Sequence, residues 1–68
     1  VKAVSGRRMC RILEKRGWTL DRVNGSCHMD RHPDNEDTVS IPVHGNRDLR
    51  KGTQRSIMRQ VGLTDAER

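Results

Sequence analysis

The stretch Trp18-Thr-Leu-Asp-Arg-Val-Asn-Gly-Ser-Cys-His-Met-Asp-Arg-His32 decides the fold. Apolar and polar residues alternate over residues 18–23, which is the pattern of a half-buried β-strand. Asn24 and Gly25 follow directly, and both residue types tolerate the positive φ that tight hairpin turns require. We therefore predict a hairpin whose second strand covers residues 26–32.

A third strand is predicted over residues 38–43, after a polar turn at residues 33–37. Its apolar side chains fall on one face, which carries Val39, Ile41 and Val43. Pro42 has no backbone N–H to donate, so it indicates the end or the edge of the strand.

The segment before the hairpin has the spacing of an amphipathic helix. Ser5 is suited to be its N-cap, and Gly17 is suited to the left-handed position after its last turn. Between them, the apolar stripe consists of Met9, Ile12 and Leu13. We predict about three turns of helix here, with basic residues on the other faces.

A second helix is predicted over residues 54–61, with Thr53 as its N-cap. Its apolar stripe consists of Ile57, Met58 and Val61. Gly62 would end the helix, and Leu63 would fold back against it in a Schellman-type contact.

The resulting order is α-β-β-β-α, an α+β fold in which two helices cover one face of a three-stranded antiparallel sheet. The other face would be open to solvent. The length, 68 residues, predicts a single domain over residues 1–68, with a core at about residues 5–63 and a polar tail at 64–68.

The charge of the chain favours an anionic partner. Fourteen Lys and Arg residues stand against nine Asp and Glu, a formal net charge of +5, and eleven of the fourteen are Arg. Guanidinium groups pair with phosphate oxygens, so nucleic acid is the first expectation. Trp18 is the sole aromatic residue, which argues against recognition by stacking bases on several rings.

Two cysteines, Cys10 and Cys27, are too few for a small disulfide-stapled secreted domain. The sequence also has no apolar run long enough for a signal peptide or a membrane span. We therefore expect a cytoplasmic protein with reduced thiols and no membrane partner.

Several motifs follow one another in an order that resembles the HicA (YcfA-like) toxin family, from near the start of the chain to Leu63. The motifs are Gly17-Trp18, Asn24-Gly-Ser26 before a histidine-containing strand, His32-Pro33, Val39-Ser-Ile-Pro-Val-His44, and Leu49-Arg-Lys-Gly-Thr followed by a helix that ends in Gly62-Leu63. The last of these is the most specific.

The resemblance implies a fold like that of double-stranded-RNA-binding domains and an activity as a metal-independent ribonuclease that cuts mRNA without a cofactor. It also implies a protein partner, a HicB-type antitoxin that blocks the active site. In this family, the catalytic histidine comes just after the Gly-Ser of the first hairpin.

The sequence departs from the family pattern at this point. Many members read Gly-Ser-His, whereas this chain reads Gly25-Ser26-Cys27-His28. We assign His28 as the catalytic residue. Cys27 carries the alternative: if the active histidine of the family directly follows Ser, Cys27 takes its place, and the chain is then a module of the same fold that binds RNA or antitoxin without cutting.

The chemistry of histidine supports the first assignment independently. An imidazole takes and gives protons near neutral pH, and RNA carries its own nucleophile in the 2′-hydroxyl group. By alternation, His28 shares a strand face with Ser26, Asp30 and His32. Because Met29 on the other face suits the core, we expect His28 on the open face of the sheet.

The expected RNA-binding residues are Gly25, Ser26, Arg22, Arg31, Lys51 and Arg55, with Arg47 and Arg50 as further phosphate contacts. The start of the second helix adds N–H groups that favour an anion. Three arginines of the first helix are instead assigned to the antitoxin: Arg7, Arg8 and Arg11.

Three other features of the sequence are not assigned a function. His32 and His44 are interpreted as structural or incidental. A zinc site is not expected, because His28 and His32 would lie roughly 13 Å apart on a strand. A DNA-binding helix-turn-helix is the weakest alternative, since the middle of the chain alternates like strands.

Overall fold

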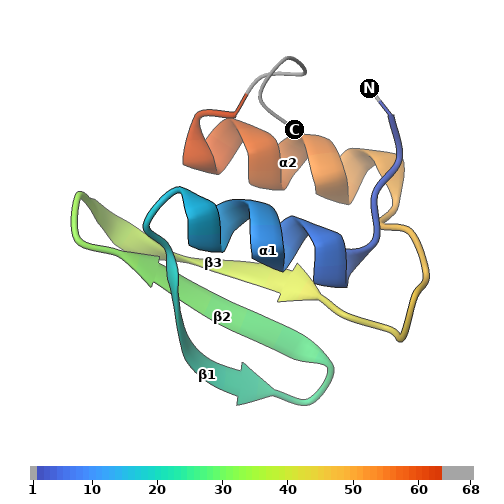
Figure 1. Cartoon of the computed structure of the whole chain (residues 1–68), viewed down its shortest axis with the longest axis horizontal. Helices are drawn as coiled ribbons and strands as arrows, with labels where there is room; N and C mark the ends of the chain where they lie inside the picture. The colour runs from blue at the N-terminus through green and yellow to red at the C-terminus, as the bar shows by residue number, and fades with distance from the viewer. Residues whose placement is uncertain (1, 64–68) are drawn as a thin grey trace.

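The computed structural model describes residues 2–63 and has the predicted order of elements (Figure 1). The elements are α1 (Gly6–Lys15), β1 (Thr19–Asn24), β2 (Cys27–His32), β3 (Asn35–Pro42) and α2 (Lys51–Val61). The sheet is antiparallel in the order β1-β2-β3, and both helices lie on one face of it. The predicted α+β fold is therefore confirmed, while the tail predicted at residues 64–68 lies outside the described residues.

Both ends of α1 have the predicted caps. The Ser5 side chain accepts a hydrogen bond from the backbone N–H of Arg8, at 3.0 Å. At the other end, Gly17 has a φ of 92°, and the Trp18 N–H donates to the Leu13 carbonyl at 3.0 Å. This pair of features is a Schellman motif, which satisfies carbonyl groups that the last turn would otherwise leave unpaired.

The first hairpin turn is centred one residue later than predicted. Asn24 belongs to β1 and pairs with Cys27, so that Gly25 and Ser26 are the turn residues. Gly25 has a φ of 62°, whereas Asn24 and Ser26 do not have positive φ. A single glycine with positive φ at the first central position is the pattern of a type II′ turn, which suits the twist of hairpins.

The second hairpin is tighter than the predicted turn over residues 33–37. His32 pairs with Asn35, which leaves a connection of only two residues, Pro33 and Asp34. The backbone N–H of Asp34 donates to Nδ1 of His32 at 3.0 Å and so closes the turn. β3 therefore begins three residues earlier than predicted, while its end at Pro42 agrees with the missing N–H of that residue.

The second helix also begins earlier than predicted. Arg50 is its N-cap, with no side-chain hydrogen bond to the helix, and the prediction of Thr53 as the N-cap is wrong. The C-terminal end is as predicted. Gly62 has a φ of 74°, and the Leu63 N–H donates to the Met58 carbonyl at 2.8 Å, which buries Leu63.

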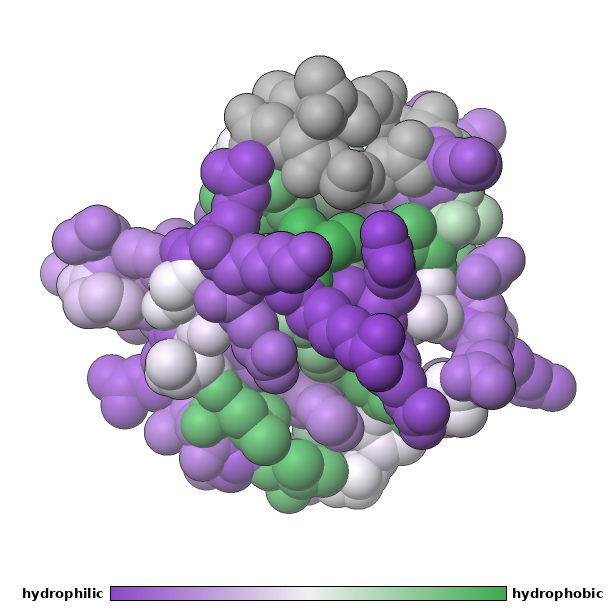
Figure 2. All heavy atoms as spheres, in the orientation of Figure 1, coloured by the Kyte–Doolittle hydropathy of each residue, from purple (hydrophilic) through white to green (hydrophobic). Residues whose placement is uncertain are grey.

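The core lies between the two helices and β3. The predicted apolar faces meet there, and the side chains without exposed surface are Met9, Leu13, Val39 and Ile41. The helices do not cover β1, since all six of its residues are exposed. The exposed fraction is 52% for Leu20 and 54% for Val23. Figure 2 shows apolar groups on the surface in the region of β1, below the two helices of Figure 1.

Candidate catalytic cleft

His28 lies on the helix-covered face of the sheet, and the prediction that it would lie on the open face is wrong. Its cross-strand partner is Ile41, and the partner of Asp30 is Val39. Both of these partners are core residues, and residues directly opposite each other in a sheet share a face. Met29 therefore points to the other side of the sheet, although its apolar side chain had suggested the core.

A cleft of about 320 Å³ lies where the hairpin extends beyond α1, and His28 is one of its walls. We call it the His28 cleft; it is lined by Arg7, Cys10, Arg11, Glu14, Leu20, His28, Asp30 and Val43. The four residues from α1 have the spacing i, i+3, i+4 and i+7, which places them on one stripe of the helix. The stripe brings two guanidinium groups and one carboxylate to the same hollow as the imidazole.

The His28 ring is half-buried and contacts Cys10 from α1. The Cys10 Sγ lies 3.8 Å from Nδ1 of His28, the distance of a weak sulfur hydrogen bond. Burial raises the pKa of the Cys10 thiol to about 11, and the nearby Asp30 and Glu14 charges act in the same direction. Cys10 is therefore a neutral thiol at physiological pH and is not suited to be a nucleophile.

Asp30 is an acidic side chain almost removed from solvent, with 2% of its surface exposed. Burial raises the pKa of its carboxyl group above the ordinary value; the charge of His28 acts against this shift, and the charge of Glu14 adds to it. Asp30 and His28 therefore interact electrostatically at the inner end of the cleft.

The hairpin tip lies close to the cleft, but two of the predicted RNA contacts do not. The Ser26 carbonyl accepts a hydrogen bond from the Val43 N–H at 2.8 Å, so the tip with Gly25 and Ser26 borders the wall that Val43 forms. Arg22 is paired with Met29 on the opposite face of the sheet. Arg31 shares that face by alternation, and its guanidinium group lies 3.9 Å from Asp21.

Cys27 is adjacent to His28 in the chain but does not line the cleft. It is half-buried and pairs with Asn24 on one side and Pro42 on the other. Adjacent strand residues point to opposite faces, so Cys27 and His28 are separated by the sheet.

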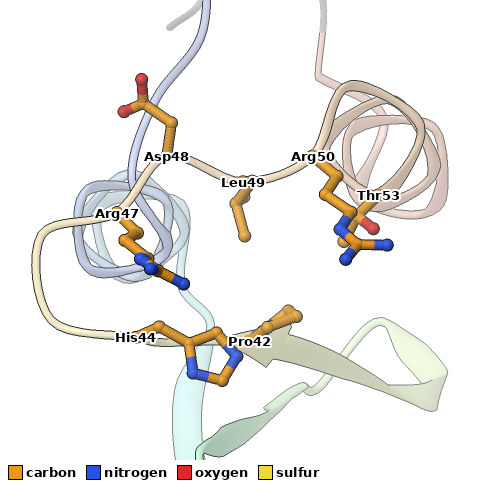
Figure 3. A pocket seen from close by; sticks show the side chains of 7 residues that line it. All are labelled: Pro42, His44, Arg47, Asp48, Leu49, Arg50 and Thr53. Atoms are coloured by element: carbon orange, nitrogen blue, oxygen red, sulfur yellow. The ribbon is translucent and has the colours of Figure 1, made fainter.

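A second hollow of about 400 Å³ lies before α2, and we call it the His44 cavity (Figure 3). It is lined by Pro42, His44, Arg47, Asp48, Leu49, Arg50 and Thr53. In Figure 3, the side chains of Arg47, Arg50 and His44 point toward its interior, whereas Asp48 points away. Lys51 and Arg55, two of the predicted RNA contacts, are exposed on α2 but line neither hollow.

The two hollows lie on either side of one short segment, residues 42–44. Val43 lines the His28 cleft, whereas Pro42 and His44 line the His44 cavity. An extended polyanion that crossed this segment would meet arginines on both sides of it.

Comparison with known protein families gives a match over most of the chain. A model of the HicA toxin of bacterial toxin–antitoxin systems matches residues 6–63, which include all five elements of the fold. The chain belongs to the HicA toxin family. A search of curated proteins gives no significant match. As a member of this family, the protein is the toxin of a toxin–antitoxin pair, and an antitoxin is its implied partner.

His32 of this HicA toxin joins elements of the fold. Its Nε2 lies 3.1 Å from the Arg16 carbonyl at the end of α1, and its Nδ1 accepts the Asp34 N–H. The ring also packs on Trp18, with centroids 5.2 Å apart. These contacts occupy both ring nitrogens and assign the proton to Nε2.

Two further observations concern the described part of this HicA toxin. Within residues 2–63, no three His, Cys, Asp or Glu side chains are arranged to hold a metal ion. Over the same residues, no helix has both the length and the apolar character needed to cross a bilayer.

Of the residues that line the HicA cleft, only His28 had been given a role in catalysis from the sequence. Arg7 and Arg11 had been assigned to the antitoxin, and Asp30 had been placed on the strand face of His28 without a role. A usable signal was present, because positions 7, 10, 11 and 14 form one helical stripe beside the apolar stripe. The sequence did not show which face of β2 would pack against this stripe.

Proposed function

We propose that this HicA toxin is an endoribonuclease that cleaves mRNA, with His28 as the residue that transfers protons. The observation that carries the proposal is the position of His28 in a cleft with Arg7 and Arg11, in a chain that belongs to the HicA family. For cleavage of a phosphodiester by the neighbouring 2′-hydroxyl, a histidine can transfer the protons and guanidinium groups can stabilise the charge on the phosphoryl oxygens.

The proposed reaction is an in-line displacement at phosphorus that needs no bound metal or cofactor. His28 takes the proton of the 2′-hydroxyl, the 2′-oxygen bonds to phosphorus, and the bond from phosphorus to the 5′-oxygen breaks. The leaving 5′-oxygen takes up a proton, and the imidazolium form of His28 is the donor that the cleft offers. Such proton transfer contributes typically ~10²–10⁴-fold to rate.

The arginines of the cleft would stabilise the charge that develops on the phosphoryl oxygens. Arg7 and Arg11 lie one helical turn apart on α1, so both can face one phosphate group. Arg47 and Arg50 line the hollow across residues 42–44 and would hold the backbone of the same RNA. The hairpin tip with Gly25 and Ser26, beside Val43, would border this path. Four more of the expected contacts, namely Arg22, Arg31, Lys51 and Arg55, would bind RNA only outside the cleft.

The antitoxin is proposed to be a HicB-type protein that covers the His28 cleft. The exposed apolar side chain of Leu20 lines the cleft with the arginines of α1, and the exposed Val23 is the cross-strand partner of His28. A partner for this surface would present acidic groups around a small apolar centre. Because mRNA is the proposed substrate, the site of action would be the cytoplasm, and one domain with its core at residues 5–63 would carry the activity.

Cleavage of a purified mRNA in EDTA tests the proposal, with His28→Ala as the variant and His44→Ala as the matched control. His44 is exposed and lines the other hollow, so its loss removes an imidazole of the chain without touching the His28 cleft. We expect His28→Ala to lower kcat by about 10²–10⁴-fold. Because His44 lies in the hollow proposed to hold the RNA backbone, His44→Ala should change KM at most and leave kcat nearly unchanged. Equal loss in both variants would contradict the role of His28.

The alternative is a module that binds RNA or antitoxin but does not cut, because Cys27 stands where many members have histidine. The variant Cys27→His separates the two functions. If the unmodified chain cuts RNA and the variant does not cut faster, the endoribonuclease proposal stands. If the unmodified chain binds RNA without cutting and Cys27→His cuts, the binding module is the correct function.

A further inference from the structure

Gln54 is a polar residue on the buried side of α2 that the proposed reaction does not use. Only 2% of its surface is exposed. Its Oε1 accepts a hydrogen bond from the Val4 N–H at 3.0 Å, and its Nε2 donates to the Lys2 carbonyl at 2.8 Å. An N–H must face Oε1 and a carbonyl must face Nε2, so these partners fix the orientation of the amide. Gln54 therefore clamps the segment of residues 2–5, which we call the N-terminal strap.

The N-terminal strap is also bonded to the loop that joins β3 to α2. The Val4 carbonyl accepts a hydrogen bond from the Leu49 N–H at 2.8 Å, and Ser5 forms an antiparallel bridge with Asp48. Residues 43–50 contain no helix or strand, so these contacts take the place of regular hydrogen bonds in fixing the path of the loop. In Figure 1, the strap runs past the start of α2 and beside this loop. Val4 thus joins α2, through its N–H, to the loop, through its carbonyl.

This loop carries the basic side chains of the His44 cavity. Arg47 and Arg50 line the cavity and point toward its interior, as His44 does (Figure 3). Arg47 is two positions before Leu49, and Arg50 is one position after it. The bond from Leu49 to the strap therefore anchors the backbone between the two arginines. Side chains on an anchored backbone lose less conformational freedom when they bind a phosphate group.

The other end of the strap leads into α1 and the His28 cleft. The Ser5 side chain caps α1 by accepting a hydrogen bond from the Arg8 N–H at 3.0 Å. Arg7 and Arg11, which line the His28 cleft, follow in the first turns of this helix. One segment is thus connected to both pairs of arginines, on the two sides of residues 42–44.

We propose that Gln54 is a positioning residue for RNA binding: through the N-terminal strap it holds the loop so that Arg47 and Arg50 are in place for the RNA backbone. The inference rests on the proposed function, because it concerns the same RNA. Gln54 is too buried to touch RNA itself and lines neither hollow, so it acts through the strap and has no part in proton transfer. Its loss should weaken RNA binding and leave the chemical step unchanged.

The first test measures the clamp itself, by hydrogen–deuterium exchange of backbone amides in the full chain. The variant is Gln54→Met, which fills the same space with an unbranched apolar side chain and removes both hydrogen bonds. The matched control is Gln60→Met, the same substitution at an exposed position of α2 that lines neither hollow.

We expect the Leu49 amide to exchange at least about 10-fold faster in Gln54→Met, because its bond to the strap opens locally. The Leu13 amide of α1 should change much less, since the rest of the fold stays closed. In Gln60→Met, both amides should exchange as in the unmodified chain.

The second test separates binding from catalysis. Affinity would be measured by fluorescence anisotropy with an RNA that carries 2′-O-methyl groups, which lacks the nucleophile and stays intact. Gln54→Met should raise its Kd by about 5–50-fold, the factor expected when two arginine side chains become ordered only on binding. With cleavable RNA, KM should rise and kcat should stay within about two-fold. Gln60→Met should match the unmodified chain in both measurements.

Val4→Pro tests the same clamp from the side of the strap, and it serves as the test if Gln54→Met does not fold. Proline has no N–H, so the hydrogen bond to Oε1 is lost while Gln54 stays in α2. Val4→Pro should reproduce the rise in Kd. The double variant should bind no more weakly than the weaker single variant, because both changes open one clamp. Additive losses would mean that the two residues act separately.

The outcomes separate this inference from the proposed function. Unchanged Leu49 exchange or an unchanged Kd in Gln54→Met would overturn the role of Gln54. So would a lower kcat at constant KM, or equal acceleration of Leu49 and Leu13 exchange, which would mean a general loss of structure. If the unmodified chain binds the methylated RNA but cuts no RNA, the proposed cleavage is wrong, and the exchange and anisotropy results still decide the role of Gln54.

Discussion

The two cysteines of the chain have different surroundings and therefore different reactivity. Burial and nearby carboxylates raise the pKa of Cys10 to about 11, so little thiolate forms at neutral pH. Cys27 is half-buried on the opposite face of the sheet. Because the thiolate is the reactive form, we predict that iodoacetamide at pH 7.5 modifies Cys27 and leaves Cys10 unmodified.

Peptide mass spectrometry after timed labelling measures this difference. Labelling of Cys10 should increase only as the pH approaches about 11, where its thiolate forms. The same shift predicts that the stability contributed by the protonated Cys10 is complete below pH 9 and is lost as the pH rises toward 11. Equal labelling rates at pH 7.5 would contradict this description of the cleft.

Asp30 should reduce the stability of the fold at neutral pH. Its pKa is raised above the ordinary 3.8, so its contribution to the free energy of unfolding is present below that pH and is lost as the pH rises. We therefore predict that Asp30→Asn is more stable than the unmodified chain at pH 7 and that the difference shrinks toward pH 3. Urea denaturation at several pH values measures it; a variant that is less stable at every pH would contradict the prediction.

The sequence identified His28 as the candidate residue but placed it on the wrong face. Met29 is the one apolar residue of β2 apart from Cys27, and it was taken to point into the core. The face is decided instead by pairing with β3, whose Val39 and Ile41 lie opposite Asp30 and His28. A single residue in a polar strand is a weak signal, because the pairing register depends on the neighbouring strand.

At the scale of the elements, α1 begins against the end of β3. Gly6 is buried, and a Cβ atom there would overlap the Pro42 carbonyl oxygen and lie 3.2 Å from the Val43 Cα. Backbone atoms have little freedom to move, so we predict that Gly6→Ala lowers the free energy of unfolding by about 1–3 kcal/mol.

Gly52, in the first turn of α2, is the matched control for Gly6. A Cβ atom there would have open space, and its φ is not positive. Gly52→Ala should therefore leave stability unchanged or raise it by up to about 1 kcal/mol. Thermal denaturation of both variants tests the pair; similar melting temperatures would mean that α1 does not pack closely on the segment after β3.

The type and order of the elements were predictable from the sequence, whereas several boundaries were not. The N-cap Ser5 and the glycines after both helices are local signals, and the structure confirms all of them. β3 begins at Asn35 because the two-residue turn allows the polar residues after it to pair with β2. The composition of this segment alone does not indicate such pairing. α2 begins without a side-chain cap, so Thr53 was a misleading cue.

For the whole molecule, the decisive feature is that two helices cover β3 and leave β1 uncovered. The apolar stripes correctly predicted two helices on one face of the sheet. They did not predict an uncovered β1: the alternation over residues 18–23 indicated a half-buried strand, whereas all six residues of β1 are exposed. They did not predict the cleft, because its position depends on how far the hairpin extends beyond α1. The residues of the cleft come from α1, the first two strands and the segment after β3, so only the packed structure brings them together.

The central claim is that the cleft cleaves RNA through the RNA's own 2′-hydroxyl, and the chemical ends of the products test it most directly. The RNA would be cut in EDTA and its fragments analysed by mass spectrometry, beside a 2′-deoxy copy of the same sequence. We predict 2′,3′-cyclic phosphate and 5′-hydroxyl ends from the RNA and no cutting of the deoxy copy. Fragments with 3′-hydroxyl and 5′-phosphate ends would contradict the account, because they require attack by water instead.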